Sequence, residues 1–78
     1  MPVINIKVLK GAMSEDKKKE MILRVTETVA EIEARPYPKE KLLPYTFCLI
    51  EEVDMKNWGI GGKTVTPEML KAVMEGKT

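Results

Sequence analysis

The sequence predicts a small α/β (α+β) domain, in which a βαβ unit is followed by a C-terminal hairpin and a short helix. Three observations support this class of fold. Apolar residues alternate near the start of the chain, a long helical repeat follows, and a second apolar run comes after it. Because 78 residues leave room for one domain, we expect residues 1–78 to form a single unit.

The first strand is expected over residues 3–9, where Ile and Val alternate with other residues and one face is fully apolar. Gly11 then breaks the strand, and Ser14 is a favourable N-cap for the helix that follows. Apolar residues recur at helical spacing through the next two dozen positions. The helix is expected to end near Ala34, because Pro36 disfavours helical geometry at the residue before it.

Residues 35–44 contain three prolines and predict an ordered, turn-rich connector with room for one helical turn. The second strand is expected from about Tyr45 to Val53. Its largely apolar run is typical of a strand that is covered on both faces. Two strands joined by a helix are expected to be parallel, with a right-handed crossover.

The C-terminal third begins with the glycine-rich segment 57–62, which predicts a turn or hairpin. Thr66 is then a favourable N-cap, Pro67 suits the first helical position, and Gly76 can stop the short helix. A two-stranded sheet with one helix leaves its edges and one face uncovered. Pairing with another copy of the chain would cover them.

Composition excludes several classes of function. Thirteen basic against twelve acidic residues give a net charge of +1, which is not a footprint for nucleic acid or for an anionic membrane. Cys48 is the single cysteine and histidine is absent, so disulfides, a metal site and an imidazole base are not expected. No apolar run has transmembrane length, and no signal peptide is evident. We therefore expect a soluble, cytoplasmic protein that self-associates.

Pro2 is the unusual feature of the N-terminus. A proline at the start of a strand can have a purely structural role at a sheet edge, where no backbone N–H donor is needed. A small second residue also permits removal of Met1, which would make the Pro2 nitrogen a secondary amine. Apolar surroundings lower the pKa of such an amine toward neutrality, where it can take up a proton and return it.

Three segments together resemble the 4-oxalocrotonate tautomerase family: Pro2–Gly11, Ser14–Lys17 and Asn57–Gly62. The resemblance covers nearly the whole chain apart from the connector. It implies a βαβ protomer whose dimer forms a four-stranded sheet, usually within a hexamer of three dimers, although a dimer or trimer stays open. It also implies an amino-terminal proline that moves a proton between carbons of an enol or dienol acid, yielding the conjugated ketone without a cofactor.

The same resemblance suggests a pocket around this proline. Trp58 falls where the family has an aromatic residue that forms an apolar wall, although an aromatic in the core or an interface is the alternative. Ile60 and Leu9 match apolar pocket positions, and either is equally compatible with interface packing.

The positions of two family arginines are occupied differently here, by Ala12 and Phe47. Neither can bind a carboxylate or stabilise an enolate as arginine does. Arg35, at the expected end of the helix, is a candidate substrate-binding cation from a neighbouring protomer. Its alternative role is to cap the helix carbonyls.

These observations predict an isomerase that interconverts enol and keto forms of a small unsaturated 2-oxo acid, with Pro2 as base and then acid. Hydration or dehalogenation of an unsaturated acid by the same proline is an alternative reaction. A noncatalytic subunit of a mixed oligomer is an alternative of another class, suggested by the two absent arginines.

Overall fold

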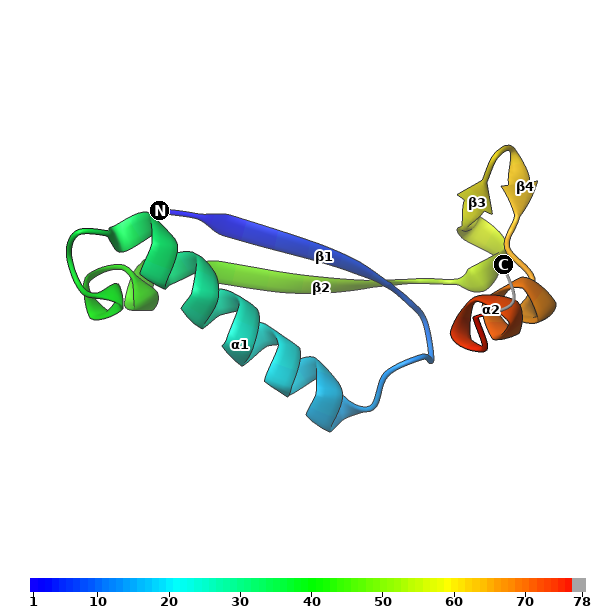
Figure 1. Ribbon diagram of the computed structural model, residues 1–78, viewed down its shortest axis with the longest axis horizontal. Helices are drawn as coiled ribbons and strands as arrows, with labels where there is room; N and C mark the ends of the chain where they lie inside the picture. Colours follow the sequence, from blue (N-terminus) through cyan, green and yellow to red (C-terminus); the bar gives the residue numbers. More distant parts are fainter. Residues whose placement is uncertain (77–78) are drawn as a thin grey trace.

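The computed structural model describes residues 1–76 and contains the predicted βαβ unit (Figure 1). Strand β1 (Val3–Leu9) leads through helix α1 (Glu15–Ala34) to strand β2 (Phe47–Val53). The two strands are parallel, with Val3 opposite Phe47 and Leu9 opposite Val53. The predicted order of elements and the parallel pairing are confirmed.

Local sequence signals set both ends of α1. The Ser14 side chain accepts a hydrogen bond from the Lys17 backbone N–H at 3.2 Å, and acidic residues occupy the first turn, where the helix dipole favours them. The helix ends at Ala34, as predicted from Pro36, and the Arg35–Pro36 peptide bond is cis.

The connector forms two 3₁₀ turns, Lys39–Lys41 and Leu43–Tyr45. The second strand therefore begins at Phe47, and the prediction that it begins at Tyr45 was wrong. The Tyr45 N–H donates to the Leu42 carbonyl at 2.9 Å, which commits Tyr45 to the turn and leaves it unavailable to the sheet. Apolar composition alone did not reveal this competing hydrogen bond.

Helix α1 covers one face of the sheet only. Ala30 and Ala34 are the buried apolar residues of residues 1–76, and their small side chains let the helix approach the strands closely. On the other face, Val3, Phe47 and Leu49 are 66%, 59% and 51% exposed. The expectation that β2 is covered on both faces is therefore not met within one chain.

The C-terminal part begins beyond β2 with a 3₁₀ turn and contains three further elements: β3 (Gly59–Ile60), β4 (Lys63–Thr64) and α2 (Pro67–Met74). The β3–β4 hairpin turns at Gly61 and Gly62, whose φ angles of +61° and +83° are unfavourable for other residues. Thr66 caps α2 by accepting a hydrogen bond from the Met69 N–H at 3.2 Å. The predicted hairpin and short helix are confirmed.

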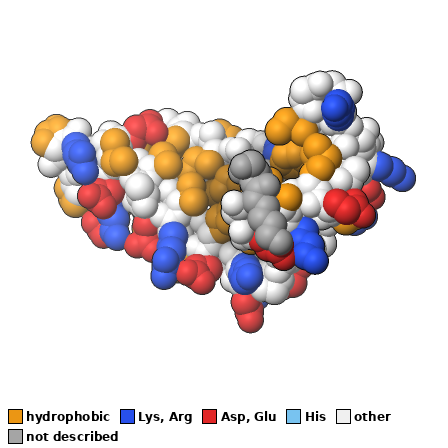
Figure 2. Space-filling view, turned by 45° about the vertical axis from the view of Figure 1, so that its right-hand side comes forward, with side chains coloured by type: hydrophobic (Ala, Val, Ile, Leu, Met, Phe, Trp, Pro, Cys, Tyr) orange, Lys and Arg blue, Asp and Glu red, His pale blue; other side chains and the backbone are white. Residues whose placement is uncertain are grey.

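The described chain is elongated, with extents of 46 × 26 × 22 Å and a radius of gyration of 16.0 Å. A compact domain of this length has a radius of gyration of about 11.5 Å. Its accessible area is 6221 Å², against about 4,800 Å² expected for a folded monomer of this mass. Hydrophobic side chains gather along the body of the chain and again at the hairpin (Figure 2). In residues 1–76, no helix is long and apolar enough to cross a membrane.

Candidate active site

Pro2 lies at the outer end of the sheet, where β1 begins (Figure 1). It is half-buried, and its carbonyl accepts a hydrogen bond from the Phe47 N–H at 3.1 Å. Phe47 is therefore the neighbour of Pro2 on the adjacent strand. An apolar side chain occupies the place for which the family resemblance implied an arginine.

Arg35 lies at the same end of the molecule, because α1 runs back along the sheet and finishes near the start of β1 (Figure 1). Its guanidinium pairs with Glu31 at 3.4 Å, one helical turn earlier. Both side chains are more than half exposed, so this pair restrains Arg35 only weakly. The guanidinium is thus accessible at the proline end.

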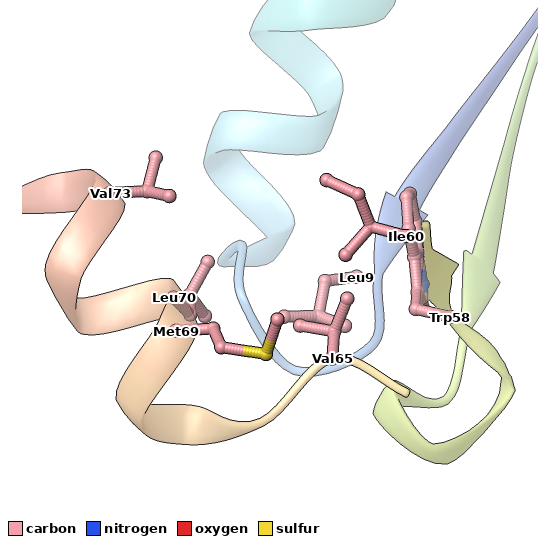
Figure 3. Close-up of a pocket in the computed structure, with 7 residues that line it drawn as sticks. All are labelled: Leu9, Trp58, Ile60, Val65, Met69, Leu70 and Val73. Atoms are coloured by element: carbon pink, nitrogen blue, oxygen red, sulfur yellow. The ribbon is translucent and has the colours of Figure 1, made fainter. Parts of the chain in front are cut away.

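The other three predicted residues meet at the opposite end. Leu9, Trp58 and Ile60 line one pocket of about 320 Å³ (Figure 3). The Trp58 indole N–H donates to the Val53 carbonyl at 3.0 Å, which ties the ring to the end of β2. The structure therefore brings these three residues together, as the sequence analysis expected of a pocket.

Four lining residues of this pocket were not predicted as site residues: Val65, Met69, Leu70 and Val73. The last three lie on α2 and face the hairpin across the pocket (Figure 3). Their spacing along the chain places them on one apolar side of the short helix. The sequence did not reveal which surface that face would meet.

Within one chain, Pro2 and Trp58 do not share a pocket. Strand β1 separates the two ends, and its seven residues span about 23 Å. Pro2 and Arg35 therefore lie at one end of the sheet, and the Trp58 pocket lies at the other. A site containing both groups requires a second copy of the chain.

Several charged side chains on the sheet and on the adjoining start of α1 form hydrogen bonds or ion pairs. Glu51 accepts hydrogen bonds from Asn5 and Lys7, which lower the pKa of its carboxyl. Lys18 lies between Glu52 and Glu15 at 2.5 and 2.9 Å, and the hydrogen bond to Glu52 is the main cause of its raised pKa.

Two basic side chains of α1 differ in exposure. The Lys18 side chain is only 19% exposed, because it reaches from α1 to Glu52 of β2. Arg24 pairs with Glu20 at 3.0 Å, and both of these side chains are more than half exposed. Across residues 1–76, no cluster of three or more His, Cys, Asp or Glu residues is placed to hold a metal ion.

The arrangement defines the chain as a βαβ protein with a proline at the open end of a parallel sheet. Comparison with known proteins agrees with this class. A family model described as "Tautomerase enzyme" matches residues 2–68. "Probable tautomerase K2" of Dickeya dadantii is 33% identical over 72 residues, which are 92% of this chain and 98% of the relative.

Solved structures give the same result. The crystal structure of "apo unFused 4-OT" aligns with a TM-score of 0.68 and 30% identity, covering 82% of this chain and 93% of its own. A structure from a study of the 4-oxalocrotonate tautomerase isozymes of Methylibium petroleiphilum aligns with a TM-score of 0.60 and 33% identity, covering 81% and 90%. The chain belongs to the tautomerase family, and the βαβ protomer fold implied by the resemblance is confirmed.

Proposed function

We propose that Pro2, made N-terminal by removal of Met1, is the general base and then the general acid of a tautomerase acting on a small unsaturated 2-oxo acid. The observation that carries this proposal is the position of Pro2 at the start of β1 within the family-matched region, where it is half-buried at the end of the sheet. Apolar surroundings disfavour the ammonium form of the amine. A neutral amine can then accept a proton near pH 7.

The proposed reaction moves one proton from the enol hydroxyl to a carbon atom through the Pro2 nitrogen. The neutral Pro2 amine takes the hydroxyl proton of the enol. As the C=O bond forms, the electron pair of the C=C bond shifts onto the carbon atom next to the new carbonyl. The resulting ammonium delivers its proton to that carbon, which restores the amine. The cycle requires no cofactor, because the same nitrogen accepts and returns the proton.

We infer that each site is shared between copies in a cytoplasmic homo-oligomer, in which the Trp58 pocket of one copy meets the Pro2 end of another. The separation of about 23 Å along β1 supports this inference. The exposed Val3, Phe47 and Leu49 supply an apolar face for self-association. We favour a hexamer of three dimers, each dimer forming a four-stranded sheet, and a dimer or trimer is the alternative.

Substrate orientation is assigned to the remaining predicted residues. Trp58, Ile60 and Leu9 form the apolar side of the site. Arg35 is the proposed partner of the substrate carboxylate, because it lies at the proline end and its pair with Glu31 is exposed. This arrangement differs from a site with cations at Ala12 and Phe47.

Intact mass spectrometry of the cell-expressed protein tests the first requirement. The expected mass is that of the chain lacking Met1. Uniform retention of Met1 would end the proposal, because an amide-linked proline nitrogen is not basic.

Mixing two impaired variants and assaying a phenyl-bearing substrate tests the shared site. Pro2→Ala and Trp58→Ala chains are unfolded, combined in equal amounts and refolded together. About a quarter of the sites then combine native Pro2 from one chain with native Trp58 from another, so activity should return to that fraction. If each site lay within one chain, the mixture would be no more active than the average of the two variants measured separately.

A noncatalytic subunit is the second candidate, because Ala12 and Phe47 cannot supply the family's cations. Turnover by a homo-oligomer of this chain alone would exclude it. A chain that is inactive alone and becomes active only with a related subunit would establish it.

A further inference from the structure

The pocket at the hairpin end is apolar around its whole lining. It has a volume of about 320 Å³, within the range of small-molecule sites, and no lining side chain is charged. Figure 3 shows Met69, Leu70 and Val73 of α2 on one side and Trp58 and Ile60 on the other. Such a pocket favours a hydrocarbon group and disfavours a carboxylate, which would lose its hydration without gaining a partner.

Trp58 is held in a way that presents its ring to this pocket. Its only polar atom, the indole nitrogen, is already satisfied by the Val53 carbonyl at 3.0 Å. The carbon surface of the ring is therefore left for stacking against a flat apolar group. Leu9, from the end of β1, joins the pocket to the sheet.

The rim of the pocket is open to solvent. Ile60 and Val73, on opposite sides of it, are 62% and 59% exposed. Helix α2 supplies one side, although it begins at Pro67 and the family match ends at residue 68. Most of this wall therefore lies outside the residues that the family model matches.

We propose that α2 is a specificity element, and that the pocket between it and the hairpin binds an aromatic or branched apolar substituent of the substrate. This inference rests on the proposed function and names its substrate class. The preferred substrate is an enol of a 2-oxo acid with one carboxylate and a hydrocarbon group, and dicarboxylates are poor substrates.

Fluorescence of Trp58 tests the proposal without relying on turnover, because it is the only tryptophan. The assembled protein is titrated with 3-phenylpropionate, propionate and glutarate. We expect a saturable change with 3-phenylpropionate at concentrations about 10- to 100-fold lower than with propionate, from burial of the phenyl ring. Glutarate should bind no better than propionate. Equal binding of glutarate and 3-phenylpropionate would overturn the proposal.

A charge at the rim provides the matched test. Val73→Arg should weaken 3-phenylpropionate binding by about tenfold and strengthen glutarate binding, because a guanidinium replaces an apolar wall. Met74→Arg is the control, since Met74 is the next residue of α2, is 81% exposed and does not line the pocket. The same change at both positions would contradict a role of the pocket.

A second copy could instead fill the pocket. In that case 3-phenylpropionate would leave Trp58 fluorescence unchanged and Val73→Arg would change the solution mass, and this result would overturn the proposal. Steady-state kinetics distinguish failure of the pocket proposal from failure of the proposed function. Turnover of the enols of pyruvate and phenylpyruvate that is insensitive to Pro2→Ala refutes the role of Pro2. Turnover that depends on Pro2 but shows no preference for the phenyl group refutes only the role of the pocket.

Discussion

The two ends of this chain are built in different ways. At the proline end, backbone pairing fixes the site: Pro2 is held through its carbonyl by Phe47, in register with the rest of the sheet. At the hairpin end, side-chain packing of Leu9, Trp58 and α2 forms the pocket. The proposed base and the proposed binding surface are therefore separate structures.

The largest expected effect is at the proline end. Pro2→Ala should lower kcat/KM by about 10²- to 10⁴-fold, because a primary amine of different basicity and shape replaces the proposed base. The solution mass should stay unchanged, since position 2 contributes little to packing. Steady-state kinetics and light scattering measure the two quantities. Full activity of this variant would show that Pro2 is not the catalytic base.

The hairpin end should show a smaller loss of a different kind. Trp58→Ala should lower kcat/KM by about 10- to 100-fold for a phenyl-bearing substrate, through lost apolar contact, and less for a substrate without the ring. Trp58→Phe retains an apolar aromatic ring and is the control, with an expected loss well below that of alanine. A loss that is identical for both substrates would place Trp58 outside the binding surface.

Stability should also differ between the ends. Ala30→Leu should lower the free energy of unfolding by about 1–3 kcal/mol, because Ala30 is fully buried between α1 and the sheet and a larger side chain has no space. Met74→Ala, at an 81% exposed position of α2, should change it by less than about 0.5 kcal/mol. Urea denaturation at fixed protein concentration measures both. Equal changes in the free energy of unfolding for the two variants would show that Ala30 is no more tightly packed than Met74.

The smallest effect concerns pH and the ion pairs of Lys18, which join α1 to β2. The pKa of Lys18 is raised in the folded state by Glu52 and Glu15. Its contribution to stability is therefore complete below its ordinary value of 10.5 and is lost as pH rises through the higher folded value. Wild type should be more stable than Lys18→Met at pH 8, and the difference should shrink toward pH 11. The measurement is Tm at both pH values, with Lys17→Met, on the exposed neighbour, as control. A constant difference would contradict the pairing.

Much of the fold was predictable because its signals are local. The Ser14 cap, the stop before Pro36 and the glycine turn at 61–62 each depend on residues adjacent in the chain. The start of β2 was missed because the connector's 3₁₀ turns compete for Tyr45, and apolar composition does not reveal that competition. The pairing of Lys18 with Glu52 could not be read from local sequence, because the two residues are distant in the chain.

The sequence by itself determined the family, the order of elements and the candidate residues Pro2, Trp58, Ile60, Leu9 and Arg35. Only the tertiary structure decided that these residues divide between two ends of one sheet, and that α2 completes the pocket at one of them. The reason is physical. Local caps, turns and periodicities are fixed by neighbours along the chain, whereas the distance from Pro2 to Trp58 depends on the length and direction of two parallel strands.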